Sequence, residues 1–425
     1  MKRRPRLTTP GRVWLVFAFA LIGLAAVGMT RIPTVRSVLI WRVEVARAQV
    51  LDWWSGRSDT LPTPSADAVV STPVTGGPAV VASYEDSVTP ARPTPTALPG
   101  PTALPPTATP VPLPPTVTLT GVKYEKQDLN NCGPATLAMM LSYWGWQGDQ
   151  SVIADVLKPA TRDKNVRWDE LVYYVKTRAG WLDALFRVSG TIDGLKPFIA
   201  DGYPVIIETG YTVKSGWVGH YLLLTGYDEA AQTFVVQDAT GGPDRIMPYT
   251  DVDRDWQQFN RLFILVFPPA DREKIMALLG TDADEATNRQ RALDTAFAET
   301  ERDPQNAFAW FNLGSNLNYF DRYGEAAQAF DKARQIGLPW RMLFYQFGPY
   351  RTYFNIGRYQ DVIDLADAVL KARPDLEENF FWRGWARYML GDKDGAIADF
   401  RSALEVNPGF EDARAALGSL GVAAH

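Results

Sequence analysis

The sequence QDLNNCGPATLAMM, residues 127–140, holds Cys132, which is the only cysteine among 425 residues. One thiol excludes an intrachain disulfide and a zinc site built on cysteines, because each needs at least two thiols. The asparagines before Cys132 and the glycine after it indicate a loop, and Pro134 is typical of the first turn of a helix. Since N–H groups at a helix start stabilise an anion, this position favours a reactive thiolate over a buried structural cysteine.

Few residues could act as the base for this thiol, because the chain has two histidines and one of them, His425, is the last residue. The other, His220, follows a glycine and begins the apolar stretch 220–227, which is typical of a β-strand. A side chain at such a strand end can project into a cleft. An imidazole beside Cys132 can take the thiol proton, so the two residues form a candidate nucleophile and base.

The region around these two residues, 119–268, changes from helical to strand patterns along its length. Apolar spacing predicts helices over 134–144, 150–157, 169–177 and 192–200, and then strands over 204–209, 220–227, 233–238 and 261–267. Helices followed by strands predict an α+β domain with an antiparallel sheet.

In this context, the segment around Cys132 resembles the nucleophile segment of the papain-like cysteine peptidases. It is most similar to family thirty-nine of the cysteine peptidases, which removes leader peptides after a double glycine in bacteriocin export. That family has a glutamine before the cysteine, a histidine that begins a strand and an aspartate that ends the next strand. Gln127, His220 and Asp238 stand at these places, while Asn131 replaces the usual aspartate.

The resemblance implies a role for each of these residues. Cys132 is the nucleophile, His220 is the general base and acid, Asp238 orients the imidazole, and the Gln127 amide stabilises the oxyanion together with the backbone N–H of Cys132. From the residues alone, two other acids compete with Asp238 for the orienting role, and these are Asp228 and Asp244.

The last third of the chain, 291–425, follows a connector at 269–290 and repeats itself. Four prolines recur at intervals of 34 or 35 residues, and they are Pro304, Pro339, Pro374 and Pro408. Small and aromatic residues recur between them at fixed offsets, as in Gly314, Ala326, Phe330 and Ala333, and again in Gly384, Ala396, Phe400 and Ala403. This all-α region resembles tetratricopeptide repeats, with a degenerate middle unit that has Tyr350 and Val362 where the family has Gly and Ala.

Such repeats imply a concave surface that binds a protein partner or the substrate. We predict that aromatic residues line it and that some of the candidates belong instead to the core; the candidates are Trp310, Phe311, Tyr345, Tyr350, Trp382 and Trp385. As a separate module, the repeats carry no chemistry. Removing residues after about Arg291 is therefore expected to spare the cleavage of a short peptide.

The N-terminal part predicts a membrane attachment. Residues 1–30 combine a basic start with an uncharged apolar run, which favours a transmembrane signal anchor over a cleaved signal peptide. Residues 31–55 form a juxtamembrane segment, and 56–118 a disordered linker rich in Pro and Thr that holds the later domains away from the membrane. Five positive side chains and the α-amino group precede the span and four arginines follow it, which places the peptidase and repeat regions outside the cytoplasm.

The composition limits the remaining function classes. A net charge of −5 and a pI near 5.3 give no support for nucleic-acid binding, and the sequence predicts no metal and no cofactor. We therefore expect a single-pass, extracytoplasmic cysteine peptidase whose repeats recruit a peptide or protein. The chain lacks a phosphate-binding loop, so coupling to an exporter is not expected. The alternative is a non-catalytic scaffold that binds peptides or proteins.

Overall fold

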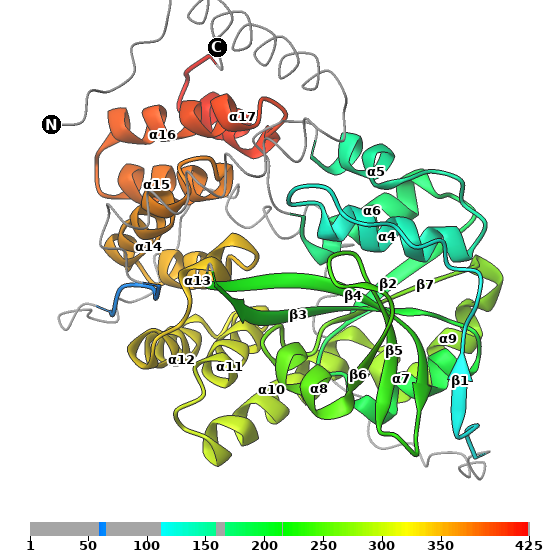
Figure 1. Cartoon of the computed structure of the whole chain (residues 1–425). Coiled ribbons are helices and arrows are strands. Elements are labelled where there is room, and N and C mark those ends of the chain that lie inside the picture. The colour runs from blue at the N-terminus through cyan, green and yellow to red at the C-terminus, as the bar shows by residue number, and fades with distance from the viewer. Residues whose placement is uncertain (1–58, 65–111, 159–165, 215, 424–425) are drawn as a thin grey trace, which may run out of the picture. The chain divides into compact units, whose positions relative to one another are not determined.

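The computed structural model describes residues 59–64, 112–158, 166–214 and 216–423 (Figure 1). The predicted anchor at 1–30, the juxtamembrane segment at 31–55 and most of the linker lie outside the described residues. Within the part that is described, no helix combines the length and apolar character needed to cross a bilayer.

A seven-stranded sheet forms the centre of the first half of the described chain, with the order β2-β7-β3-β4-β5-β6 and with β1 paired to β4. Each pair is antiparallel, as the sequence predicts. The strands are β1 (Thr116–Thr118), β2 (Asp183–Arg187), β3 (Val205–Val213), β4 (Gly216–Asp228), β5 (Thr233–Asp238), β6 (Gly242–Pro248) and β7 (Phe263–Phe267).

Helices cover both faces of this sheet (Figure 1). They are α4 (Cys132–Tyr143), α5 (Gln150–Leu157), α6 (Trp168–Arg178), α7 (Ile192–Ala200), α8 (Tyr249–Gln257) and α9 (Arg272–Leu279), with short 3-10 turns η1 (Pro269–Asp271) and η2 (Gly280–Ala283). Neighbouring strand residues point to opposite faces. Leu223 accordingly joins the core under α4 to α6, whereas Leu222 joins the core under α7 to α9.

The predicted elements of this region are present in the structure, with shifts of a few residues at their ends. The helices α5 and α7 and the strand β5 have the predicted bounds. Sequence reasoning missed β1, β2, β6 and α8. β6 is an edge strand with mostly exposed residues, so its sequence lacks the apolar alternation on which strand prediction depends.

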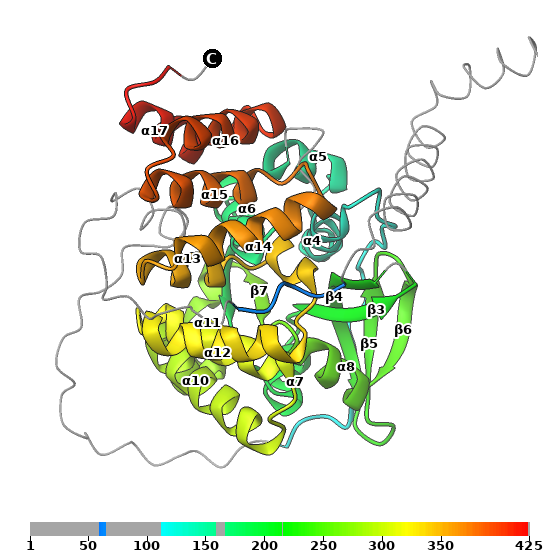
Figure 2. The ribbon, with the colours of Figure 1, turned by 90° about the vertical axis from the view of Figure 1, so that its left-hand side faces the viewer.

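The second half of the described chain stacks helix pairs one after another (Figure 2). The helices are α10 (Glu285–Arg302), α11 (Ala307–Tyr319), α12 (Tyr323–Ile336), α13 (Gly348–Asn355), α14 (Tyr359–Ala372), α15 (Glu377–Met389), α16 (Lys393–Val406) and α17 (Glu411–Ser419), with the 3-10 turn η3 at Trp340–Phe344. A Cβ on Gly314 would lie 2.7 Å from the Phe330 ring, and one on Gly384 would lie 2.7 Å from the Phe400 ring. Glycine is needed at both places because the partner helix carries a phenylalanine.

The degenerate middle unit keeps this packing by exchanging the large and the small residue. Tyr350 stands on α13 where the other units have glycine, and Ala366 stands on α14 where they have phenylalanine. Both residues are fully buried, and so is Val362. The large aromatic side chain therefore lies on the first helix of this pair instead of the second, and the two helices still pack together.

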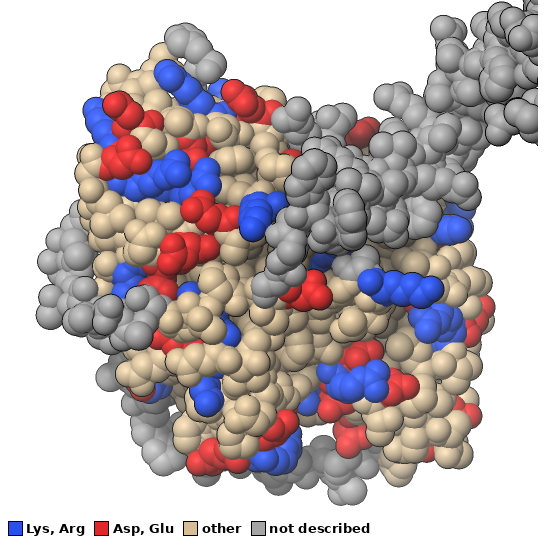
Figure 3. All heavy atoms as spheres, turned by 60° about the vertical axis from the view of Figure 1, so that its left-hand side comes forward, with Lys and Arg blue, Asp and Glu red and all other residues tan. Residues whose placement is uncertain are grey.

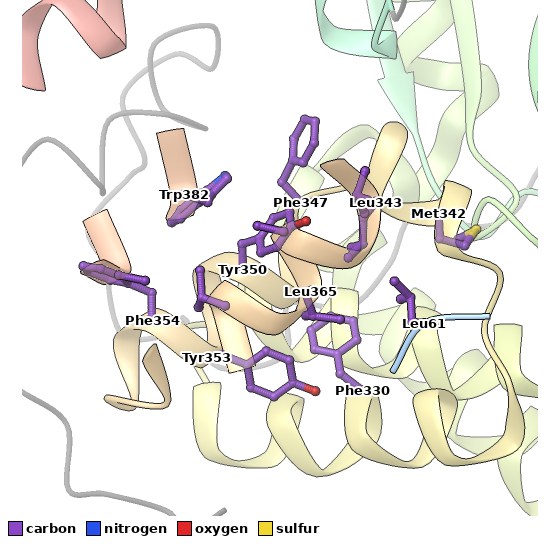
Figure 4. Close-up of a cluster of buried hydrophobic side chains, with 14 of the residues drawn as sticks. Leu61, Phe330, Met342, Leu343, Phe347, Tyr350, Tyr353, Phe354, Leu365 and Trp382 are labelled. Atoms are coloured by element: carbon purple, nitrogen blue, oxygen red, sulfur yellow. The ribbon is translucent and has the colours of Figure 1, made fainter. Parts of the chain in front are cut away.

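The predicted aromatic binding surface on the repeats is wrong for most of its members. Phe311, Tyr350, Trp382 and Trp385 are at most 1% exposed, because they fill the space between the stacked helices. Figure 4 shows Tyr350 and Trp382 inside this hydrophobic cluster.

The repeats share their hydrophobic core with the first half of the chain. Trp217 of β4 stacks on Phe259 with ring centroids 5.6 Å apart, and it also contacts Phe308 of α11 and Tyr345 of the repeats, each at 6.0 Å. Trp217 and Phe259 are 6% and 2% exposed. The two regions are therefore joined through a common core, and the expectation of a separate repeat module does not hold.

Polar contacts extend the same interface. Asn260 donates to the Asn316 side chain at 2.9 Å, and Arg261 forms an ion pair with Glu299 at 2.7 Å. Asn288 makes two hydrogen bonds to the Val188 backbone, at 3.0 and 2.9 Å. Partnered buried polar groups of this kind fix the relative position of the two regions within residues 58–425, which form one compact unit.

The linker prediction fails at the two ends that the structure describes. At one end, Thr116–Thr118 forms β1 and pairs with β4. At the other end, residues 59–64 lie along the repeats: Leu61 donates its N–H to Leu338 at 2.8 Å, is 3% exposed, and points into the cluster with Leu343 (Figure 4). One apolar side chain and backbone pairing are enough to dock this end, which composition alone does not reveal.

The described surface carries charges of both signs. On the face that Figure 3 shows, acidic and basic side chains are interspersed among uncharged residues.

Candidate active site

Cys132 is the first residue of α4, and this end of the helix docks on the backbone of β4. The Thr136 hydroxyl, one turn later, donates to the Tyr221 carbonyl at 3.3 Å, and the Tyr221 N–H is a hydrogen-bond partner of the Cys132 sulfur. Strand β5 pairs with β4 only from Leu223 onward. The N–H and carbonyl groups of Tyr221 are therefore available for hydrogen bonds to α4. The residue before Tyr221 is His220, and this docking therefore brings nucleophile and imidazole together.

His220 lies between Cys132 and Asp238. Its Nε2 is 2.9 Å from Asp238 Oδ1, and both side chains are 5% exposed. The other ring nitrogen, Nδ1, is thereby left for the sulfur, with which the imidazole shares a hydrogen bond. A carboxylate on one nitrogen and a thiol on the other fix the orientation of the ring.

Asp238 is held in place by the turn that follows β5. Its Oδ1 accepts from the N–H groups of Thr240 at 2.8 Å and Gly241 at 2.9 Å, and its Oδ2 pairs with Arg245. A Cβ on residue 241 would lie 2.4 Å from Oδ2, so this tight approach needs glycine. Burial opposes ionisation of Asp238, but the hydrogen bond and charge of His220 and these N–H groups hold its pKa well below the ordinary value.

The two acids that compete with Asp238 lie elsewhere. Asp228 accepts from the Ala231 N–H at 2.9 Å in the turn after β4, and Asp244 accepts from the Gln237 side chain at 2.7 Å. Of the three acids, Asp238 is the one that contacts the imidazole.

The half-buried Cys132 is electrostatically prepared to ionise. Burial by itself would raise the pKa of the thiol, but the hydrogen bond and charge of His220, the Tyr221 N–H and the charge of Lys158 bring it below the ordinary value. For His220, burial favours the neutral ring, whereas Asp238 and Cys132 raise its pKa to about 9. At neutral pH, both shifts favour a thiolate–imidazolium pair.

Gln127 lies on the segment that leads into α4. Its N–H donates to the Ala239 carbonyl at 2.9 Å, and its Oε1 accepts from the Thr240 hydroxyl at 2.9 Å. The amide oxygen is therefore held by the same turn that holds Asp238. The Nε2 donor has no partner within the part of the chain that the structure describes, which leaves it available to an oxyanion.

A known protein family matches the part of the chain that holds these residues. Residues 119–264 match the model of the Peptidase_C39 like family. This part of the chain is a C39-like peptidase domain. No curated protein sequence matches the chain.

Solved structures with similarity to the chain have low identities and TM-scores. A protein described as a C39-like peptidase from Bacillus anthracis is 19% identical, covers 36% of this chain and 96% of its own, and has a TM-score of 0.30. MamA 41-end from Desulfovibrio magneticus RS-1 is 16% identical over 36% of this chain and 84% of its own, with a TM-score of 0.30. A double glycine motif protease from an AMS/PCAT transporter, solved with the leader peptide, is 21% identical over 36% and 97%, with a TM-score of 0.27.

The sequence did not reveal three residues that lie outside the family motif and hold the site residues in place. Thr136 and Arg245 carry no family signal that single-sequence inspection would find. Tyr345 comes from the repeats, and its hydroxyl accepts from the Gly219 N–H at 3.3 Å, directly before His220. One of these could have been found earlier, because Thr136 lies one helical turn after Cys132 and therefore on the same helix face.

The raised pKa of His220 predicts an alkaline limit to any activity of this domain. Above about pH 9 the ring loses its proton, so it can no longer protonate a leaving amine, and cleavage should fall. The contribution of this group to folding stability is fully present below the unfolded pKa of about 6.5 and is lost as the pH rises through 9. Peptide cleavage and thermal unfolding measured between pH 7 and about 10.5 check both limits.

Asp238→Asn provides the matched control. Without the carboxylate charge, the pKa of the imidazole should fall, and the alkaline limit should move to lower pH. A limit that stays in place in this variant would show that another group sets it.

Proposed function

We propose that the protein is a cysteine peptidase that hydrolyses peptide bonds through Cys132, His220 and Asp238. One observation carries this proposal, namely the continuous line of contacts from sulfur to imidazole to carboxylate. The lowered pKa of Cys132 and the raised pKa of His220 support it, since both follow from those contacts.

In the proposed reaction, the Cys132 thiolate attacks the scissile carbonyl carbon, and the π-electron pair of that carbonyl moves to the oxygen. The imidazolium of His220 then protonates the leaving amine as the C–N bond breaks, which leaves a thioester on Cys132. A water molecule attacks the thioester while His220 takes its proton. The C–S bond breaks, the carboxylic product leaves, and the thiolate–imidazolium pair is restored.

The tetrahedral oxyanion needs donors that are already in place. The Cys132 N–H at the start of α4 and the Gln127 Nε2 are the proposed donors. Neither has to break an internal bond within the described chain to serve. Fixed donors of this kind are among the largest single contributions to acyl-transfer rates.

The repeats have a second role in this proposal, which is to recruit a protein substrate or partner. Membrane attachment through residues 1–30 and an extracytoplasmic location also belong to the proposal. They rest on the apolar run and the flanking arginines of the sequence.

The function is tested by incubating the purified chain with a denatured protein mixture and identifying new N-termini by mass spectrometry. We expect cleavage by the wild type and none by Cys132→Ala. With a peptide from that experiment, Gln127→Ala should lower kcat by roughly 100- to 1,000-fold and change KM little, because the donor acts on the transition state. A wild-type chain that cleaves nothing would support the non-catalytic binding scaffold instead.

A further inference from the structure

A cavity of about 230 Å³ lies between the C39-like domain and the repeats. The domain contributes residues from β3, α6 and the turn before β7, and the repeats contribute residues from α10, α11 and the segment between η3 and α13. This volume is below the range of about 300 to 1,000 Å³ typical of small-molecule pockets, and it suits a single amino-acid side chain.

The charges around this cavity do not balance. Its lining contains four carboxyl groups and three guanidinium groups, and these belong to Asp169, Glu208, Asp284 and Glu285, and to Arg167, Arg289 and Arg351.

Most of these groups have a partner in the structure. Arg167 pairs with Asp169, and Arg351 lies 3.3 Å from Asp321 outside the cavity. Asp284 accepts from the Thr287 N–H at 2.8 Å.

Two of the remaining three groups are occupied by contacts of other kinds. The Arg289 guanidinium lies 4.9 Å from the Tyr319 ring centroid, and Glu285 interacts with the charge of Arg187. Glu208 is then the one carboxyl group of the described lining that has no positive counterpart.

Glu208 is almost fully enclosed, with 1% of the residue exposed, and its Oε2 has no hydrogen-bond partner in the described chain. Its one side-chain hydrogen-bond neighbour is Tyr221. Burial, followed by the nearby charges of Cys132 and Asp169, raises the pKa of Glu208 well above its ordinary value. Burial therefore favours the neutral form of this carboxyl group, and an entering cation would favour its ionised form.

We propose that this cavity is a specificity subsite for a basic side chain, lysine or arginine, of the peptide substrate, and that Glu208 is its counter-charge. The inference rests on the proposed peptidase function. Aromatic walls suit the long aliphatic stem and the cationic end of such a side chain, and they come from Trp168, Phe186, Tyr319 and Phe347. Gln346 also lines the cavity, and its unpartnered Nε2 supplies a donor for a substrate carbonyl.

The position of Glu208 relative to the Cys132 sulfur determines which residue of the substrate, counted from the scissile bond, would carry the basic side chain. Glu208 of β3 is the direct register partner of Tyr221 of β4, whose N–H reaches the Cys132 sulfur. Neighbouring strands are about 4.8 Å apart, and an extended peptide advances about 3.3 Å per residue. The basic residue therefore belongs within about two positions of the scissile bond.

The test compares peptides that carry lysine or norleucine at each position near the scissile bond. For the wild type, we expect kcat/KM to favour lysine at one position by about tenfold or more, as for other desolvated charge pairs. Glu208→Gln should bring this ratio close to one. Glutamine is an uncharged isostere of the protonated acid, so the variant should fold. Glu325→Gln, at an exposed ion pair of the repeats, is the matched control and should keep the preference.

A binding measurement separates failure of this inference from failure of the peptidase proposal. In a Cys132→Ala background, calorimetry near pH 6 in two buffers of different ionisation enthalpy should show that N-acetyl-lysine amide binds with a net release of protons. N-acetyl-norleucine amide and the Glu208→Gln double variant should show no such release. Equal binding of both amides, or a lysine preference that survives Glu208→Gln, would overturn the subsite even if peptides are cleaved.

Discussion

Replacing His220 with alanine is expected to slow the alkylation of Cys132 by iodoacetamide at pH 6 by on the order of 100-fold. The hydrogen bond and charge of the imidazole lower the pKa of this thiol, and without them burial works against the thiolate. A free thiol with a pKa of about 8.5 is less than roughly 1% ionised at pH 6. Mass spectrometry of the single cysteine gives the rate without interference from other thiols.

Peptide hydrolysis by the same variant should fall further, by about 10⁴-fold, because His220 also protonates the leaving amine. Two controls accompany the measurement. Alkylation in urea should proceed at the same rate in wild type and variant, since unfolding removes the environment of the site. Asp238→Asn should lie between the two proteins, because it keeps the ring but not its orienting carboxylate. Equal alkylation of the folded wild type and His220→Ala would remove the basis of the peptidase proposal.

Removing the repeats by ending the chain at Gly280 is expected to abolish cooperative unfolding and the selective reactivity of Cys132. The truncation would expose Trp217 and Phe259, each of which contributes on the order of 2 to 3 kcal/mol by burial. It would also leave Arg261 without Glu299 and the Gly219 N–H without Tyr345. A loss of this size is a large fraction of the stability of most domains.

The measurement is thermal unfolding, followed by circular dichroism, together with the alkylation rate. Phe308→Ala in the full chain is the graded control, because it removes one ring that contacts Trp217 and leaves the repeats in place. It should lower the Tm without removing the transition. If the truncated chain unfolds cooperatively at the Tm of the full chain and keeps fast alkylation, the shared core does not support the site, and the two regions are independent modules.

The fold was predictable wherever the sequence carries a strong local period. The helix at 150–157 and the strand at 233–238 have their predicted bounds, since apolar spacing and turn residues delimit both. The edge strand β6 was not predictable, because exposed edge positions place no demand on residue type. The exchange between Tyr350 and Ala366 also escaped prediction, because it depends on two helices in contact and not on either helix alone.

The candidate site was predictable in its members but not in its surroundings. Cys132, His220 and Asp238 follow from residue rarity and from the family resemblance, and the structure brings them together. Glu208 was not found, and Tyr345 was named for the repeat surface and not for the site, because a residue of this kind matters only through its neighbours. The sequence shows only a glutamate within an apolar strand. It shows neither the cavity that Glu208 lines nor the absence of a positive partner for its carboxyl group among the described lining residues.

The docking of Leu61 changes what a membrane attachment could do. Both ends of the stretch 65–111 are tied to the same compact unit, so its length adds nothing to the distance between that unit and a bilayer. If residues 1–30 are embedded, only residues 31–58 set the reach, which is at most roughly 100 Å for a fully extended chain. An enzyme held this way would work on proteins at or near the surface of its own cell.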